Sequence, residues 1–136
     1  MKRHATAVWD GTIKEGEGHL TSQSGVLKQT PYSFVSRFGN GAGTNPEELM
    51  AAAHAGCFTM KLSADLTSAG YHPQELITTS TITLVRGVIT QSDLILTAKI
   101  DGITEEEFQK IAKSAEETCP VSNAYKLEIS LQATLQ

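Results

Sequence analysis

The chain has 136 residues, 40% of them hydrophobic, and a net charge of -4 at pH 7. This size allows one domain that buries about two-thirds of the surface of the unfolded chain, and we expect a single domain over residues 1–136. The 11 basic residues are scattered, so neither nucleic acid nor a membrane is expected as a partner. No stretch approaches the roughly 18 apolar residues of a membrane span, and we expect a soluble, cytoplasmic protein.

Short strands joined by glycine turns are predicted for the first forty residues. The segments HATAVW, EGEGHLTSQSGVL and TPYSFVSRF combine aromatic, β-branched and glycine residues, which is typical of strands in hairpins. By default, Arg37 is then a solvated residue at the end of a strand. Three glycines follow in GNGAGTNP, but no GK[ST] motif accompanies them, so they favour a flexible rim of an active site over a nucleotide-binding loop.

A long helix is predicted from Pro46 to about Ser68. Thr44 and Asn45 are possible N-caps, and proline suits the first helical position. Gly70 favours a C-terminal stop. The helix is apolar nearly all round, and such a helix needs cover on more than one side. The few strands of this chain can cover one face, so we infer a homodimer in which the other face packs against a partner subunit.

The remaining chain predicts two strands, LITTSTITLV and DLILTAKI, linked by the polar segment RGVITQS. An amphipathic helix over ITEEEFQKIAKSAEET and a one-faced strand in KLEISLQATL follow. The order of strands, long helix, strands, helix and strand indicates an α+β fold with antiparallel β-sheets and not a parallel β-α-β fold.

The two cysteines, Cys57 and Cys119, are far apart in the sequence and form no CxxC motif. The four histidines show no ligand spacing with them, so no metal site is expected. Pro120 can open a short turn with Cys119 as its N-cap, where backbone N–H groups favour a thiolate. The residues alone leave open whether the two thiols form a reactive pair or are both structural.

His54 precedes Cys57 by three residues, so both lie on one helical face. They could form a Cys–His pair. A histidine on so apolar a helix is, however, more often a core residue whose nitrogens are hydrogen bonded, and this second reading also stays open.

Two cysteine segments together carry a family resemblance. GTNPEELMAAAHAGCFTMKLS closely resembles the signature of the osmotically induced protein C (OsmC) and organic hydroperoxide resistance (Ohr) family, and CPVSNAYKLEISL resembles its second cysteine segment. The likeness extends to AVWDGTIKEGEGHLTSQSGVL and PYSFVSRF and so covers the whole chain. Because the arginine follows PYSFVS, the chain looks like the OsmC branch, with Gly56 at a position where alanine is common.

The resemblance implies antiparallel β-sheets wrapped around long central helices in an intertwined homodimer, with active sites at the subunit interface. It implies a thiol peroxidase that reduces organic hydroperoxides, and hydrogen peroxide more weakly, without a metal or organic cofactor. Cys57 matches the peroxidatic cysteine, Cys119 the resolving cysteine, and Arg37 and Glu47 the residues that activate the first thiol. The cycle would pass through a Cys57 sulfenic acid and a Cys57–Cys119 disulfide. A dithiol would restore the thiols: a lipoyl protein, thioredoxin or a small thiol.

Ten positions separate Glu47 from Cys57, which is about 15 Å along a continuous helix. The two residues could share a site through a long reach by Arg37, a break in the helix or assembly from two chains. Because the helix is apolar nearly all round, we expect two such helices to pack across a two-fold axis, with Glu47 approaching Cys57 from the partner subunit. Two other functions fit the same sequence: a non-catalytic homodimeric protein that binds a small apolar molecule, and a redox sensor. Reactivity of Cys57 in the native state distinguishes catalysis from binding, because a structural buried thiol is inert.

Overall fold

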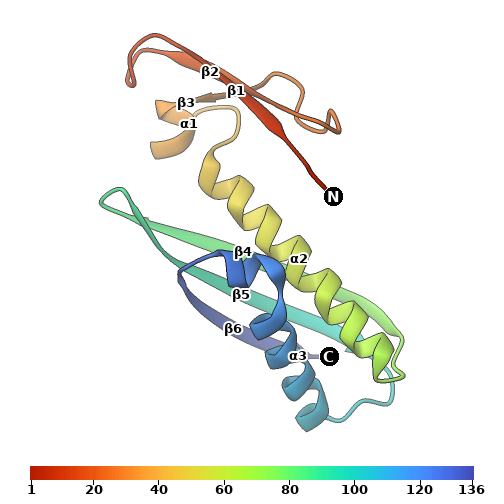
Figure 1. Ribbon diagram of the computed structural model, residues 1–136. Coiled ribbons are helices and arrows are strands. Elements are labelled where there is room, and N and C mark those ends of the chain that lie inside the picture. Colours follow the sequence, from red (N-terminus) through yellow and green to blue (C-terminus); the bar gives the residue numbers. More distant parts are fainter. The chain divides into compact units, whose positions relative to one another are not determined.

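A computed structural model describes residues 1–136, which form two compact units, Met1–Leu49 and Met50–Gln136. The single domain expected over residues 1–136 stays a prediction. Helix α2 begins in the first unit and continues in the second. The elements labelled in Figure 1 are β1 (Ala5–Asp10), β2 (Glu17–Ser22), β3 (Thr30–Ser33), α1 (Phe34–Phe38), α2 (Pro46–Ser68), β4 (Pro73–Val85), β5 (Val88–Ile100), α3 (Glu105–Thr118), α4 (Pro120–Ala124) and β6 (Glu128–Leu135).

The first unit contains the predicted meander, an antiparallel sheet in the order β1-β2-β3. Gly18 of β2 pairs with Trp9 on one side and with Tyr32 on the other. A Cβ atom at Gly18 would lie 2.5 Å from the Tyr32 ring and 2.7 Å from the Trp9 ring. Glycine therefore lets the two rings meet over the middle strand, with their centroids 5.2 Å apart.

The predicted strand over TPYSFVSRF is wrong in its second half. Only Thr30–Ser33 is a strand, and Phe34–Phe38 forms helix α1. The reason is a capping box: the Ser33 hydroxyl accepts from the Ser36 N–H, and the Ser36 hydroxyl accepts from the Ser33 N–H. These two bonds satisfy backbone donors that a helix start otherwise leaves free. Arg37 therefore lies in a helix and not at the end of a strand.

Helix α2 has the bounds that the sequence predicts, Pro46–Ser68. Asn45 is its N-cap, because its side-chain oxygen accepts from the Glu48 N–H at 2.8 Å. Gly70 follows the last turn with a φ of +91°, a conformation that favours glycine. None of the helices is both long and apolar enough to cross a membrane.

Strands β4 and β5 of the second unit form a long antiparallel hairpin. Its turn consists of Arg86 and Gly87, whose φ values are +50° and +80°. The sequence predicts a longer link over residues 86–92, but β5 already begins at Val88. Two consecutive residues with positive φ match the twist of paired strands, so two residues suffice for the turn.

Strand β6 pairs with β5 in parallel, from Gln91 opposite Glu128 to Ala98 opposite Leu135. This pair corrects the expectation of purely antiparallel sheets. A parallel pair requires a crossover connection, and α3 and α4 supply it. The α+β class is confirmed, with sheet order β4-β5-β6 in the second unit.

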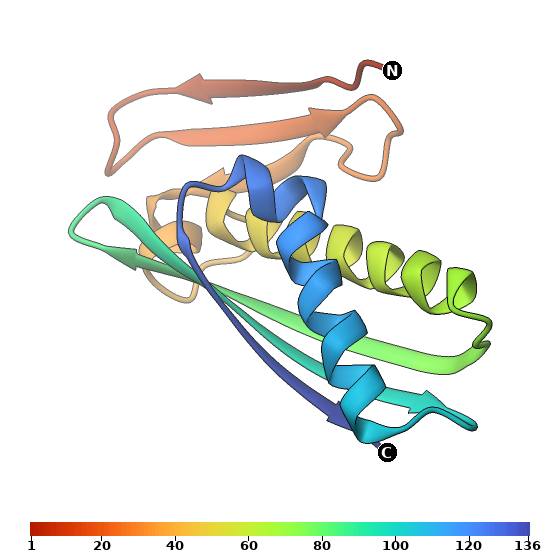
Figure 2. The ribbon, with the colours of Figure 1, turned by 60° about the horizontal axis from the view of Figure 1, so that its bottom comes forward.

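The core of the second unit lies between one face of this sheet and helices α2 and α3 (Figures 1 and 2). The predicted inward face of β5 is confirmed: alternate residues from Leu94 to Ile100 are buried. The helices contribute Phe58, Leu62 and Leu66 from α2 and Phe108, Ala112 and Ala115 from α3. Cys119 completes this cluster.

Candidate active site

Two free thiols meet in the second unit. Cys57 lies in α2, and Cys119 lies between α3 and α4. Their sulfur atoms are 3.1 Å apart, although the residues are distant in sequence. A disulfide bond needs a separation of about 2.05 Å. The fold thus brings together the two cysteines that spacing alone could not relate, and a small movement would join them.

The two thiols differ in their environment. Cys57 is partly buried, and burial together with its hydrogen bond to Cys119 raises its pKa above the ordinary value for cysteine. A backbone hydrogen bond from Val121 opposes this shift. None of the groups that shift the pKa of Cys57 carries a positive charge. A cation beside Cys57 would favour its thiolate near neutral pH.

Cys119 is completely buried and is the N-cap of α4, with Pro120 at the first helical position, as predicted. Burial by itself would raise the pKa of Cys119, but hydrogen bonds from the Ser122 backbone, the Cys57 thiol, the Ser122 hydroxyl and the Val121 backbone outweigh it, and the pKa is lowered. The side chain makes no capping hydrogen bond of ordinary geometry. These groups nevertheless lie near enough to the sulfur to favour a thiolate at the helix start.

The sequence left open whether His54 pairs with Cys57 or is a core residue with hydrogen-bonded nitrogens, and the structure shows the second. Its side chain is completely buried. Its Nδ1 atom is 2.6 Å from the Ser92 hydroxyl, and its Nε2 atom is 2.9 Å from the Ser122 hydroxyl. Burial lowers the pKa of His54 and keeps the ring neutral. Neither nitrogen bonds to Cys57, so no Cys–His pair forms.

Arg37 and Glu47 form the charged pair of the first unit. The Arg37 Nε atom donates to both carboxylate oxygens, at 3.1 and 3.2 Å, and Nη2 donates to Oε1 at 2.6 Å. The hydrogen bond from Arg37 lowers the pKa of Glu47, and the same bond raises the pKa of Arg37. Such a bidentate pair fixes the direction of the guanidinium plane as well as its charge. The structure thus joins Arg37 to Glu47, as it joins Cys57 to Cys119, with one pair in each unit.

An apolar pocket of about 210 Å³ lies beside Arg37 in the first unit. The rings of Trp9, Tyr32, Phe34 and Phe38 line it. The Arg37 guanidinium lies 5.2 Å from the centre of the Phe38 ring, a distance at which a cation is attracted to an aromatic face. An apolar cavity with one cation at its wall suits a small molecule that has an apolar body and a polar group.

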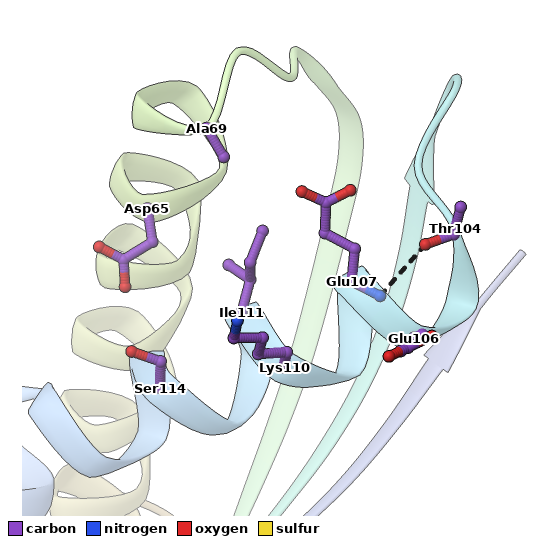
Figure 3. Close-up of a pocket in the computed structure, with 8 residues that line it drawn as sticks. All are labelled: Asp65, Ala69, Thr104, Glu106, Glu107, Lys110, Ile111 and Ser114. Carbon is purple, nitrogen blue, oxygen red and sulfur yellow. Dashed lines mark hydrogen bonds between the residues drawn. The ribbon is translucent and has the colours of Figure 1, made fainter.

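A second hollow, of about 440 Å³, lies between the end of α2 and the first half of α3 (Figure 3). Glu107, Lys110 and Ser114 line it from α3, and Asp65 from α2. The hydrogen bond drawn there, from the Glu107 N–H to the Thr104 hydroxyl, caps α3. The hollow is lined by neither of the two cysteines nor by a histidine. No group of three or more His, Cys, Asp or Glu residues is arranged to hold a metal ion.

Sequence reasoning missed the partners of His54. Ser92, Ser122 and Tyr125 surround the imidazole from β5 and from the α4 segment. The only signal was the position of Ser122, three residues after a predicted N-cap, where a polar side chain can serve a helix start. The long-range pairing with α2 has no counterpart in sequence spacing.

Comparisons with known proteins identify the family of this chain. The family model described as OsmC-like protein matches residues 39–134. Peroxiredoxin OsmC of Escherichia coli is 42% identical over 140 residues, covering 100% of this chain and 98% of that protein. An organic hydroperoxide resistance protein of Xanthomonas axonopodis pv. citri is 30% identical over 101 residues, covering 70% and 68%. In fold, the crystal structure of an OsmC like protein from Mycoplasma pneumoniae matches 99% of this chain and 97% of its own, with a TM-score of 0.77 at 16% identity. The chain therefore belongs to the OsmC-like protein family.

Proposed function

We propose that this chain is a cysteine-based thiol peroxidase that reduces organic hydroperoxides to alcohols, and hydrogen peroxide more weakly. The observation that carries the proposal is the pair of free thiols, Cys57 and Cys119, with sulfur atoms 3.1 Å apart. Relatives named peroxiredoxin and organic hydroperoxide resistance protein support a peroxidase that detoxifies hydroperoxides.

In the first step, the Cys57 thiolate attacks the terminal oxygen of the hydroperoxide. The O–O bond breaks, the sulfur is oxidised to a sulfenic acid, and the departing alkoxide takes up a proton to become the alcohol. Arg37 acts as the cation that favours the thiolate and stabilises the developing alkoxide. Glu47 orients Arg37 and does not touch the sulfur, because a nearby carboxylate would oppose thiolate formation.

In the second step, the Cys119 thiolate attacks the sulfur of the Cys57 sulfenic acid. The S–O bond breaks, hydroxide leaves as water after taking up a proton, and a Cys57–Cys119 disulfide forms. The disulfide protects Cys57 from further oxidation. A dithiol from a lipoyl protein, thioredoxin or a small thiol then reduces it by exchange. No metal or organic cofactor takes part, and a reducing compartment such as the cytoplasm keeps the resting thiols free.

A preference for organic hydroperoxides follows from the apolar pocket beside Arg37. The aromatic rings of Trp9 and Phe34 offer contact to an alkyl or aryl group, whereas hydrogen peroxide has no apolar part to bury. Arg37 would hold the peroxide oxygens at the pocket wall.

We propose further that the enzyme works as an intertwined homodimer and that Glu47 reaches the Cys57 site from the partner subunit. Helix α2 runs without a break from Pro46 to Ser68, so the rise between Glu47 and Cys57 within one chain is about 15 Å. The middle of α2 supports an interface, because its exposed residues between positions 52 and 64 are all small or apolar: Ala52, Ala53, Gly56, Met60 and Ala64. We propose that the two compact units of each chain together form one domain. The family match over residues 39–134 supports this, because it spans the boundary between the units.

The test is consumption of cumene hydroperoxide and of hydrogen peroxide, in separate assays with a dithiol reductant, by the wild type, Cys57→Ser and Cys119→Ser. We expect faster consumption of the organic peroxide, no activity in Cys57→Ser, and weakened turnover with overoxidation in Cys119→Ser. Equal inactivity of all three proteins, with an unreactive Cys57, would instead favour the second function, binding of a small apolar molecule in the aromatic pocket.

A further inference from the structure

A buried line of polar side chains leads from the sheet to the resolving cysteine. The Ser80 and Ser92 hydroxyls are 3.2 Å apart, and Ser92 is 2.6 Å from His54 Nδ1. His54 Nε2 is 2.9 Å from Ser122, which stands three residues after Cys119. Ser92 and His54 have no exposed surface, and Ser122 is 6% exposed. The line is therefore buried from Ser92 to Ser122, whereas Ser80 at its start is partly exposed.

Helix α4 is tied to α2 at two points. Ser122 bonds to His54, and the Tyr125 hydroxyl donates to the Met50 carbonyl at 3.0 Å. The Tyr125 ring also meets the imidazole edge to face, with centroids 5.4 Å apart. Cys119 is the N-cap of this short helix. Its position relative to α2, and so to Cys57, depends on these ties.

We propose that His54 is a positioning residue for the resolving step, acting through Ser122 to hold the start of α4 so that the Cys119 sulfur faces the Cys57 sulfur. This inference rests on the proposed peroxidase function and deepens it. His54 and Cys57 lie one helical turn apart on α2. Helix α2 thus carries the nucleophile Cys57 and also, through His54, positions the resolving Cys119.

The hydrogen-bond directions support this role. A neutral imidazole has one N–H donor and one acceptor nitrogen. With the proton on Nε2, His54 donates to the Ser122 oxygen and accepts from the Ser92 hydroxyl at Nδ1. The Ser122 proton is then free to point at the Cys119 sulfur, which sits beside that hydroxyl. The donors of Ser80, Ser92 and His54 each have an acceptor in the line, and Ser122 at its end stands three residues after the cysteine that must attack as a thiolate.

Few titratable groups lie around Cys119 and His54. Cys57 of α2 is in direct contact with Cys119. Burial raises the pKa of Tyr125 at the end of α4, and the charges of Cys119 and Cys57 add to this shift. Glu116 of α3 is the charged group that acts on His54, where it opposes the lowering of the pKa by burial. None of these groups is a cation, and hydrogen bonds from Ser122, Cys57 and Val121 lower the pKa of Cys119.

Packing alone does not explain a histidine here. Burying a polar ring costs free energy unless both nitrogens find partners, and an apolar residue of similar size would fill the site without that cost. The histidine is instead matched by serines on two separate elements, Ser92 of β5 and Ser122 of α4. These hydrogen bonds hold α4 in one position relative to α2. A resolving cysteine at the start of α4 needs such a fixed position to face Cys57.

The experiment compares the wild type with Ser122→Ala, His54→Leu and His54→Gln. His54→Leu keeps the volume and removes both bonds, whereas His54→Gln retains an N–H donor. Thr59→Val is the matched control, because Thr59 lies on the same helix and donates at 2.7 Å to Thr78 of β4, away from α4. Each protein receives one equivalent of cumene hydroperoxide in the presence of dimedone, and mass spectrometry measures the sulfenic acid trapped and the disulfide formed.

We expect Ser122→Ala and His54→Leu to form the disulfide at least about tenfold more slowly, since small displacements of reacting groups cost that much or more. Trapped sulfenic acid should rise in proportion, while the rate of peroxide consumption in the first turnover stays at the wild-type value. His54→Gln should recover part of the disulfide rate, and Thr59→Val should match the wild type. Disulfide rates in Ser122→Ala and His54→Leu equal to those of Thr59→Val would overturn the inference.

A second measurement does not depend on peroxidase activity. In glutathione buffers, the equilibrium between dithiol and disulfide reports the effective concentration of one thiol at the other. We expect it to fall by about tenfold in Ser122→Ala and not in Thr59→Val. A wild type that ignores hydroperoxide while these glutathione values differ as expected would refute the proposed function but leave the positioning by His54 standing. Unchanged glutathione values would refute the positioning itself.

Discussion

The guanidinium of Arg37 and the carboxylate of Glu47 form a bidentate ion pair, with the shortest contact, Nη2 to Oε1, at 2.6 Å. Arg37 comes from the short helix α1 and Glu47 from the first turn of α2. The Glu47 side chain is 12% exposed and that of Arg37 is 35% exposed. The carboxylate therefore anchors a guanidinium that still has surface available for a substrate or a thiol.

Replacing Arg37 tests its proposed action on Cys57. In a Cys119→Ser background, Arg37→Ala should raise the pKa of Cys57 and slow its alkylation by iodoacetamide near neutral pH about tenfold for each pKa unit. Glu47→Gln should give a smaller change in the same direction, because the cation remains but loses its orientation. Alkylation rates as a function of pH measure both effects. Superimposable curves for all variants would remove Arg37 from the activation of the thiol.

The exposed face of α2 predicts how to separate the proposed dimer. Met60 is 77% exposed, and Met60→Glu would place a charge in an apolar interface, where an unpaired charge is strongly unfavourable. We expect sedimentation equilibrium to find a monomer with little peroxidase activity. Val26→Glu is the control, because Val26 is 83% exposed and lies outside α2; it should remain dimeric and active. A dimeric, active Met60→Glu would rule out this face as the interface.

The core of the second unit predicts an unequal response to truncation. Leu62 is completely buried in the cluster formed by α2, α3 and β5, so Leu62→Ala should lower the free energy of unfolding by roughly 2–5 kcal/mol. Val26→Ala, at an exposed position, should change it by no more than about 0.5 kcal/mol. Urea denaturation followed by circular dichroism gives both values. Similar losses for both variants would mean that Leu62 does not belong to the core.

Burial of His54 predicts a pH dependence of stability. Its pKa in the folded protein lies below the ordinary value of 6.5, so between the two values the unfolded chain binds a proton that the folded protein does not. Unfolding is then favoured as the pH falls below about 6.5, by at most about 1.4 kcal/mol per pH unit. In His54→Gln this contribution is absent.

The measurement is the difference in unfolding free energy between the wild type and His54→Gln from pH 5 to 8. This difference should be constant above about pH 7. Below about pH 6.5, the unfolding free energy of the wild type should fall relative to that of His54→Gln. Subtracting the variant removes the contributions of the other histidines. A difference that is constant over the whole range would show that His54 titrates alike in the folded and unfolded states.

Local signals predicted the two ends of helix α2 and the start of helix α4. Asn45, Pro46 and Gly70 mark the ends of α2 by capping, fixed φ and a left-handed turn, which are properties of single residues. The N-cap position of Cys119 followed from Pro120 in the same way. Such features are visible in sequence because they involve neighbours only.

The sequence-based predictions were wrong where a specific hydrogen bond overrides local composition, and where strands far apart in the sequence pair. Aromatic and β-branched residues suggested a strand over residues 34–38, but the reciprocal bonds of Ser33 and Ser36 start a helix there. The parallel pairing of β5 with β6 depends on how α3 and α4 return the chain, which no periodicity encodes.

Only part of the candidate site could likewise be predicted from the sequence. The resemblance to a family named the four residues in advance, and the capping pattern placed Cys119. The 3.1 Å contact between Cys57 and Cys119, and the partners of His54, depend on tertiary packing between elements far apart in the chain. Spacing alone could not reveal them.

The most direct test of the central claim is the mass of the protein after one equivalent of cumene hydroperoxide, followed by peptide mapping without reduction. The account predicts that the wild type loses two hydrogen atoms and yields a peptide pair linked through Cys57 and Cys119. Cys119→Ser should instead gain oxygen at Cys57, and Cys57→Ser should remain unchanged. A wild-type protein that keeps its mass, or that gains oxygen without forming the linked peptides, would contradict a redox cycle built on these two thiols.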